Sequence, residues 1–202
     1  ENPGRIYLGV FAPGKSMKTA LLRIYAALLA STGPMNYLDE NIDPYRTIVG
    51  YFNSLRELGG AVRLVEDDVR ARMNILENRT KGQFFPYKSR KYSYDVPELT
   101  SRISSNKIPE ILENLEKQVN EDTGEGIHTV LASNMISVGM DVPRLGLMAV
   151  NAQPKTTAEY IQATSRVGRE HPGLVITLYN WVRPRDVSHY ENFIGYHSSL
   201  YR

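Results

Sequence analysis

Short apolar segments with the character of buried β-strands alternate along this sequence with longer segments whose apolar residues recur at helical spacing. The expected strands are Arg5–Ala12, Arg46–Phe52, Thr129–Ala132, Leu145–Asn151 and Leu174–Tyr179. The expected helices are Met17–Ala30, an interrupted helix that Ser54 caps and that continues through Val69–Leu76, Ile108–Val119 and Thr156–Val167. Strands that alternate with helices of this length are typical of βαβ units, whose strands pair in parallel. The sequence therefore predicts an α/β layer fold with a mainly parallel central sheet.

Length and composition indicate an ordinary globular protein. The 202 residues suit one domain, with an N-terminal strand, turn, helix and loop over 1–45, an insertion over 79–94 and a C-terminal extension over 180–202. The chain starts at Glu1 without a methionine or a signal-peptide pattern, so we expect a fragment of a longer protein. It holds no cysteine, which excludes a disulfide framework and a thiolate metal site and fits a cytoplasmic location.

Charge and histidine placement point to no obvious ligand. The net charge of +2 does not mark a nucleic-acid-binding protein, so only local clusters of charge carry that information. No apolar run approaches the roughly 18 residues of a membrane span, and we expect no membrane partner. The histidines show no metal-ligand spacing, so we expect no metal ligated by this chain; they are His128, His171, His189 and His197.

The most informative part of the sequence holds two motifs, each of which follows an expected strand. The first reads V-L-A-S-N-M-I-S-V-G-M-D-V-P over 130–143, and the second reads Q-A-T-S-R-V-G-R over 162–169. This pair resembles motifs V and VI of superfamily 2 helicases, which lie in the second RecA-like domain of those enzymes. The sequence departs from the family pattern at Ser165, where the family has glycine, and at Ser133, where the family has threonine.

The chemistry of ATP hydrolysis explains the two arginines of the second motif. Charge builds on the γ-phosphate oxygens during the reaction, and an arginine inserted from a facing domain accelerates it by about 10³–10⁵. Arg166 and Arg169 lie three positions apart, so on one helical face both reach one phosphate cluster, with Gln162 one turn earlier. The resemblance implies that Arg166 and Arg169 are catalytic and that ATP is bound by Gln162, Gly139 and Asp141. It also implies that Asp141 links the nucleotide site to the nucleic acid.

Three segments resemble the positions at which the family holds a nucleic-acid backbone. Ser133 in the first motif is expected to contact a phosphate. The segment Ile48–Ser54 resembles motif IV, an apolar strand that ends in small polar residues, here Asn53 and Ser54. The segment Leu99–Arg102 occupies the place of a further backbone contact, which involves Thr100, Ser101 and Arg102. Capping of the following helix by Thr100 or Ser101 is the structural alternative.

As a whole, the resemblance implies the C-terminal, RecA-like domain of an ATP-dependent helicase or translocase, with a three-layer fold. ATP and Mg²⁺ would be held mainly by the first RecA-like domain, so we expect the isolated chain to hydrolyse little ATP. The expected partners are that first domain of the same protein and a nucleic acid, with DNA favoured over RNA. A narrower resemblance, to the helicase of DISARM-type anti-phage systems, rests on residues 134–148, 153–169 and 178–191 and implies defence-system proteins as further partners.

Two alternative functions stay open. The segment Gly9–Ser16 satisfies the P-loop pattern between a strand and a helix, which indicates an autonomous P-loop NTPase. Against that reading, Pro13 removes a backbone donor, and the family keeps its P-loop in the first domain. The acidic run Val65–Asp68 imitates a magnesium box but lies in a helical context. The second alternative is a nucleic-acid-binding module without enzymatic activity, whose helicase motifs have degenerated.

The segment Arg79–Tyr94 differs in composition from the rest of the chain, because basic and aromatic residues alternate in it without an acid. Basic side chains on phosphates and rings stacked on bases would let such a loop follow a single strand. The alternative is a loop whose aromatic rings pack on this domain or on the first one. The aromatic residues near the C-terminus are expected to pack rather than to read bases.

Overall fold

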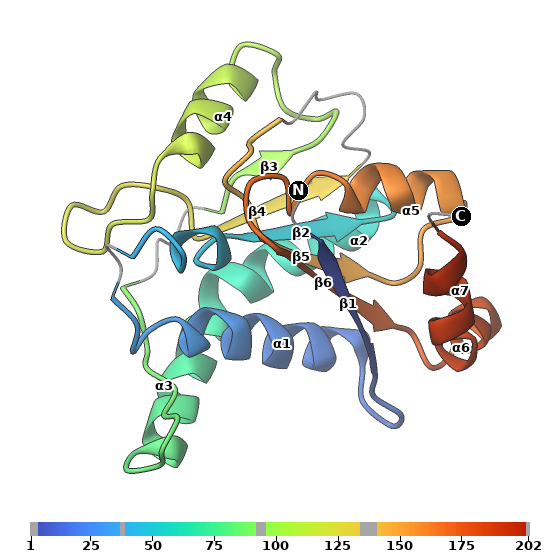
Figure 1. Ribbon diagram of the computed structural model, residues 1–202, viewed down its shortest axis with the longest axis horizontal. Coiled ribbons are helices and arrows are strands. Elements are labelled where there is room, and N and C mark those ends of the chain that lie inside the picture. Colours follow the sequence, from blue (N-terminus) through green and yellow to red (C-terminus); the bar gives the residue numbers. More distant parts are fainter. Residues whose placement is uncertain (1–3, 37–38, 92–95, 134–140, 201–202) are drawn as a thin grey trace.

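The computed structural model describes residues 4–36, 39–91, 96–133 and 141–200, and these form a six-stranded sheet with helices on both faces (Figure 1). The strand order is β1-β6-β5-β2-β4-β3, and every neighbouring pair is parallel. The strands are β1 (Arg5–Phe11), β2 (Ile48–Phe52), β3 (Glu98–Leu99), β4 (Thr129–Ser133), β5 (Leu147–Asn151) and β6 (Gly173–Tyr179). The predicted α/β, three-layer RecA-like fold is confirmed. Strand β3 is too short to show an apolar pattern in the sequence.

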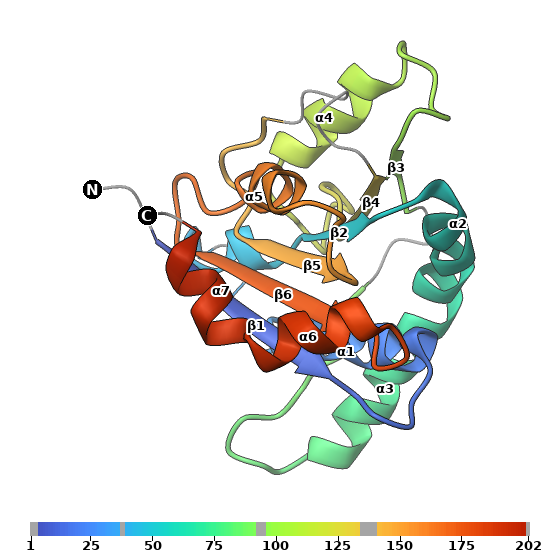
Figure 2. The same cartoon turned by 90° about the vertical axis from the view of Figure 1, so that its right-hand side faces the viewer.

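The helices form one layer on each side of the sheet (Figures 1 and 2). Helices α4 and α5 cover one face and α1 and α3 the other, while α6 and α7 lie together next to β6. The helices are α1 (Met17–Ser31), α2 (Leu55–Arg63), α3 (Val69–Thr80), α4 (Ile108–Glu116), α5 (Thr157–Thr164), α6 (Pro184–Glu191) and α7 (Phe193–Ser199). A short 3-10 helix, η1, spans Asp43–Tyr45. No helix among the described residues combines the length and the hydropathy that a membrane span requires.

Two helical segments bear directly on the predicted motifs. The interruption between α2 and α3 is a π-helical turn, η2 (Leu64–Asp68), so the acidic run Val65–Asp68 lies inside a continuous helical stretch, as expected. Helix α5 ends at Thr164 instead of Val167, because the chain turns there toward β6. Both motif VI arginines therefore lie beyond the helix.

Central strand β2 shows how the core forms. All of its residues are buried, as is typical of a parallel strand covered on both faces. Ile48 and Phe52 pack in the cluster with α1, α2 and α3, whereas Val49 and Tyr51 pack in the cluster with α4 and α5. Gly50 leaves room for α1, since an added Cβ would lie 2.1 Å from the Tyr25 hydroxyl.

A buried cluster of charged residues lies at the ends where β2 and β4 begin. Arg90 is 3% exposed and donates to the Glu121 carboxylate at 3.0 Å and to Nδ1 of His128 at 3.1 Å. Arg46 pairs with the same carboxylate. Burial, together with the charges of Arg90 and Arg46, lowers the pKa of His128 to about 3, so its ring is neutral and accepts a hydrogen bond. Arg90 is thus enclosed, and the hypothesis that it contacts a nucleic acid is wrong.

The insertion forms a protruding end beyond α3. Thr80 still belongs to α3, and its hydroxyl accepts a hydrogen bond from the Tyr87 backbone at 2.9 Å. Phe84 and Phe85 pack edge to face on each other and are 91% and 83% exposed. Packing on this domain is therefore wrong for these two rings, while packing on a first domain and stacking on bases stay predictions.

Candidate nucleotide and nucleic-acid interface

Three candidate nucleic-acid contacts meet at one edge of the sheet, because the carboxyl ends of parallel strands lie together. The strand register pairs Phe52 with Ser133 and Leu99 with Ala132. Asn53 and Thr100 therefore follow directly beside Ser133. Ser133 is 5% exposed and Thr100 is 1% exposed, so both hydroxyls lie beneath the surface of this edge.

The side chain of Asn53 holds a turn of the neighbouring chain. Its Nδ2 donates to the carbonyl oxygens of Asn151 at 3.2 Å, Ala152 at 3.3 Å and Gln153 at 3.4 Å. Ala152 has a φ of +66°, a conformation that alanine rarely adopts, so the turn needs such support. These bonds use the amide hydrogens that a phosphate contact would require. The geometry therefore fits a supporting role for Asn53 better than a direct contact.

Ser54 begins α2, as expected. Its hydroxyl accepts a hydrogen bond from the Glu57 backbone nitrogen at 3.3 Å, which is the ordinary N-cap arrangement. Because α2 begins directly after β2 ends, its N-terminus lies at the carboxyl edge of the sheet, where the helix dipole favours an anion. Ser54 thus positions a helix terminus suited to a phosphate.

Thr100, Ser101 and Arg102 form a turn after β3. The Thr100 hydroxyl accepts a hydrogen bond from the Arg102 nitrogen at 3.3 Å, and Arg102 pairs with Glu98 at 2.8 Å. The alternative role as helix caps is wrong, because α4 begins later, after Lys107, and has no side-chain cap. Ser101 and Arg102 are exposed at the sheet edge, as a contact with a backbone would need.

An ion pair joins the two motifs: Arg169 contacts the Asp141 carboxylate. The Asp141 side chain is 62% exposed and that of Arg169 is 35% exposed. The expectation that Arg166 and Arg169 share a helical face is wrong, since both lie in the loop after α5. Gln162 is exposed on the last turn of α5. Gly139, expected to approach the nucleotide, lies outside the described residues.

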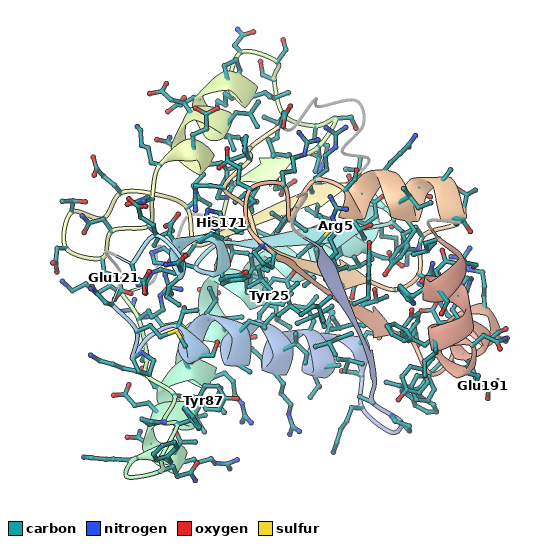
Figure 3. All side chains as sticks on the ribbon, viewed as in Figure 1. Arg5, Tyr25, Tyr87, Glu121, His171 and Glu191 are labelled. Atoms are coloured by element: carbon teal, nitrogen blue, oxygen red, sulfur yellow. The ribbon has the colours of Figure 1, made fainter. Side chains whose placement is uncertain are left out.

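Arg5 holds the loop that carries the candidate fingers, and sequence reasoning missed it. Its guanidinium donates to the Val167 carbonyl at 2.7 Å and to the Ser165 carbonyl at 3.3 Å, so it grips the backbone on both sides of Arg166. Arg5, labelled in Figure 3, begins β1, which pairs with β6. The contact joins the first strand to the far end of the sequence, and no local pattern signals it.

The loop Gly9–Ser16 is built as a strand, turn and helix cap. Gly9 lies inside β1, at an edge of the sheet, and a Cβ there would come within 3.0 Å of the Phe193 ring. The Ser16 hydroxyl caps α1 by accepting from the Thr19 nitrogen at 3.1 Å. The Lys15 carbonyl accepts a hydrogen bond from the Trp181 indole at 2.8 Å. Each of these roles is structural, and none turns the loop toward a phosphate.

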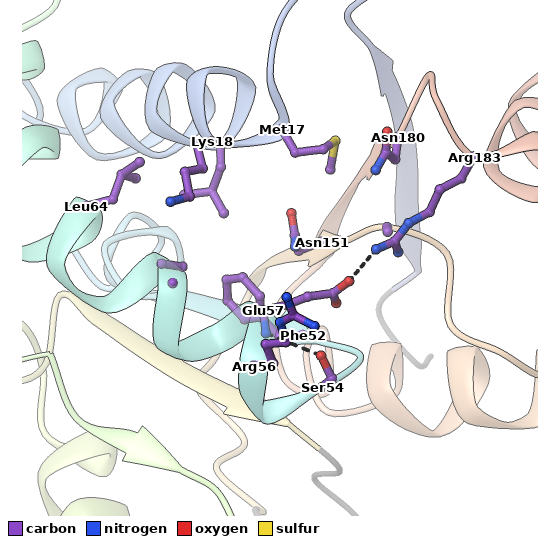
Figure 4. Close-up of a pocket in the computed structure, with 14 residues that line it drawn as sticks. Met17, Lys18, Phe52, Ser54, Arg56, Glu57, Leu64, Asn151, Asn180 and Arg183 are labelled. Atoms are coloured by element: carbon purple, nitrogen blue, oxygen red, sulfur yellow. Dashed lines mark hydrogen bonds and ion pairs between the residues drawn. The ribbon is translucent and has the colours of Figure 1, made fainter.

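A cavity of 660 Å³ opens at the same edge of the sheet between α1 and α2 (Figure 4). Met17, Leu21 and Phe52 form apolar walls, and Lys18 and Arg56 bring positive charge to it. A second cavity of 400 Å³ adjoins it, and the two share Ser54, Glu57 and Arg183. Glu57 and Arg183 form an ion pair of 2.6 Å between them. The sequence analysis did not anticipate these cavities, since their lining residues come from six separate elements and the loops between them.

Comparison with known proteins identifies the family. The model of the helicase conserved C-terminal domain matches residues 63–171, more than half of the chain, and the chain belongs to this family. A relative at 57% identity is the DISARM protein DrmA of Bacillus paralicheniformis. The match extends over 204 residues and covers 100% of this chain but only 18% of DrmA.

Solved helicases share the fold. The crystal structure of the DUF1998 helicase MrfA bound to DNA and AMPPNP superposes with a TM-score of 0.63 at 17% identity, covering 95% of this chain and 23% of that one. The yeast DEAD-box splicing factor Prp28 matches with a TM-score of 0.52 at 11% identity, covering 99% of this chain and 35% of that one. At these identities the likeness concerns the fold alone.

Proposed function

We propose that this chain is the C-terminal RecA-like domain of an ATP-dependent DNA helicase or translocase. It supplies Arg166 and Arg169 to an ATP site shared with a first RecA-like domain, and it holds the nucleic-acid backbone at the sheet edge. The observation that carries the proposal is the Arg169–Asp141 ion pair, which joins two motifs far apart in the sequence into one exposed surface. Membership of the helicase family supports the same reading.

In this mechanism the chain's own residues act by position and charge. Closure of the two domains would bring Arg166 and Arg169 onto the oxygens of the γ-phosphate, where their positive charge stabilises the transition state. Asp141 holds the Arg169 guanidinium in the open state, and Gln162 and Gly139 complete the nucleotide contact. We assign Mg²⁺ and most ATP contacts to the first domain, as the resemblance to superfamily 2 helicases implies.

The nucleic-acid contacts lie at the carboxyl edge of the sheet. We assign the phosphate contacts there to the exposed Ser101 and Arg102 and to the hydroxyls of Ser133 and Thr100, which lie just beneath the surface of the edge. Ser54 presents the first turn of α2, and Asn53 supports the neighbouring turn at Asn151–Gln153. Contacts of this kind are independent of base sequence and weaken with salt. We favour DNA over RNA through the resemblance to the helicase of DISARM-type systems, and the 57% identity to the DISARM protein DrmA suggests defence-system proteins as further partners. The cysteine-free sequence fits a cytoplasmic site of action.

Arginine substitutions in the full-length protein test the finger assignment. We expect Arg166→Ala and Arg169→Ala each to lower the kcat of DNA-stimulated ATP hydrolysis about 10³-fold. Arg23→Ala, at an exposed arginine of α1 far from the motifs, is the matched control and should leave kcat unchanged. Stimulated hydrolysis that survives both substitutions would favour a nucleic-acid-binding module with degenerate motifs.

A further inference from the structure

In the described part of the chain, several buried amide and carboxylate oxygens without hydrogen-bond partners lie close together. Among the described residues, every unpartnered buried oxygen of an amide or carboxylate side chain lies at the carboxyl edge of β2 and β5. These atoms are Oδ1 of Asn53, Oε2 of Glu57, Oδ1 of Asn151 and Oε1 of Gln153. Native proteins pair most buried polar atoms, so such a cluster indicates a ligand that donates hydrogen bonds.

The same residues line the two adjoining cavities. Asn151 and Glu57 line the larger one, and Asn53, Glu57 and Gln153 line the smaller one. Figure 4 shows the Asn151 side chain directed into the larger cavity, between Met17 and Glu57. Its volume of 660 Å³ falls within the range of about 300–1,000 Å³ that is usual for ligand sites.

The lining restricts the chemistry of the ligand. The apolar wall of Met17, Leu21 and Phe52 suits a flat ring, and the oxygens require N–H donors on that ring. Lys18 and Arg56 bring positive charge, which suits an attached phosphate and disfavours a basic peptide segment. A nucleotide whose base carries an exocyclic amine meets all three requirements, since adenine N6 and cytosine N4 donate while thymine offers no such group.

The cavity also adjoins the proposed nucleic-acid contacts. Ser54 lines both cavities while it caps the first turn of α2, the helix end that we propose for phosphate binding. A strand that lies along the sheet edge therefore passes the mouth of the cavity. An unstacked base of that strand can enter it without the strand leaving the edge.

We propose that this cavity accepts one unstacked base of the bound strand and prefers bases with an exocyclic amine. The proposal rests on the proposed nucleic-acid function of the same edge. Asn151 Oδ1 accepts the amine hydrogen in the larger cavity, and Glu57 Oε2 offers a second acceptor. The phosphate contacts remain independent of sequence, and this cavity adds a preference for base chemistry.

The test compares oligonucleotides that differ only in the amine. Fluorescence anisotropy with the full-length protein measures the Kd for labelled deoxyadenosine, deoxynebularine and thymidine homopolymers, each of about 12 nucleotides. The base of deoxynebularine is purine, which is adenine with hydrogen in place of the 6-amino group, so the two oligonucleotides share the same ring system. We expect adenine to bind about 3- to 10-fold more tightly than nebularine, as one hydrogen bond would give.

A variant locates the effect in the cavity. Asn151→Leu removes the acceptor at constant side-chain size and should bring the adenine Kd to the nebularine value. Asn114→Leu, at a half-buried asparagine of α4 on the opposite face of the sheet, is the control and should keep the preference.

The outcomes separate the two proposals. Equal Kd values for adenine and nebularine in the wild-type protein overturn the base cavity even if Asn151→Leu does not fold, while binding itself upholds the nucleic-acid function. A preference that survives in Asn151→Leu also overturns the cavity. Failure to bind any of the oligonucleotides overturns both proposals.

Discussion

Gly168 lies between the two candidate fingers, and its replacement by alanine tests how closely their loop is packed. Its φ is +73°, and an added Cβ would lie 2.7 Å from the Cα and 2.8 Å from the nitrogen of Gly173. Gly14 has a φ of +74°, and no described atom comes within 4 Å of the Cβ position there. The two substitutions therefore share the backbone strain and the effect on the unfolded chain, and they differ in steric contact.

The structure gives a magnitude for each change. In the left-handed conformation alanine destabilises the folded state by about 1–2 kcal/mol relative to glycine. Alanine also lowers the conformational entropy of the unfolded chain, which offsets about 0.4–1 kcal/mol of this loss. Gly14→Ala should therefore lower the free energy of unfolding by about 1 kcal/mol. The two nearest atoms at position 168 belong to the backbone of Gly173 and cannot rotate away. Overpacking of this kind costs about 1–3 kcal/mol more, so Gly168→Ala should lose about 2–4 kcal/mol in total.

Urea unfolding of the 202-residue chain, followed by circular dichroism, measures both values. The reasoning requires a lower midpoint for Gly168→Ala than for Gly14→Ala at an unchanged m-value. Equal midpoints for the two variants would refute it, because the close approach of Gly168 to Gly173 would then contribute nothing. A changed m-value in one variant would indicate altered compactness and would equally contradict a purely steric cost.

Three further predictions follow from the contacts. In the full-length protein, Arg5→Ala should lower the kcat of stimulated ATP hydrolysis about 10- to 100-fold, because Arg166 would be misplaced. If the double variant Arg5→Ala/Arg166→Ala loses as much activity as the two single losses combined, Arg5 does not act through Arg166. The pKa of His128 is about 3 in the folded chain and 6.5 in the unfolded chain, so between these pH values only the unfolded chain binds the proton. The free energy of unfolding should therefore fall by about 1.4 kcal/mol for each pH unit by which the pH drops between 6.5 and 3. Urea unfolding of His128→Asn, which keeps an acceptor for Arg90, should lack this slope, and a slope equal to the wild type's would exclude His128 as its source. Calorimetric titration of the isolated chain with Mg-ATP should show no tight binding, whereas tight binding that Lys15→Ala abolishes would establish the P-loop alternative.

Apolar spacing and helix-capping residues in the sequence predicted the buried strands and several helix boundaries. The buried strands and α1 follow from apolar spacing, and the N-cap Ser54 follows from residue type. The early end of α5 was missed because Ser165, Arg166 and Val167 are all compatible with a helix, and only the tertiary contacts of Arg5 and Gly168 turn the chain there. Helices α6 and α7 were missed because their aromatic residues fit a packed loop equally well.

The burial of Arg90 could not be predicted from the sequence, because it depends on contacts between residues that are distant along the chain. Arg90 belongs to a segment whose composition indicates a nucleic-acid contact, yet its guanidinium is enclosed by Glu121 and His128, which lie far along the chain. Composition reports how many cations a segment carries and not which of them find a carboxylate.

The arrangement of the two motifs suggests how nucleic acid and nucleotide communicate. Ser133 ends β4 at the sheet edge, and Asp141, which follows it across residues 134–140, pairs with Arg169 in the loop that Arg5 holds. One short covalent segment therefore joins the proposed backbone contact to the proposed finger loop. In the proposed function, a strand bound at Ser133 and a nucleotide bound at Arg169 would therefore be coupled through Asp141. Because each coupling is reciprocal, engagement of Arg169 by a γ-phosphate would release Asp141 and alter the grip on the strand, which is the exchange that stepping along a nucleic acid requires.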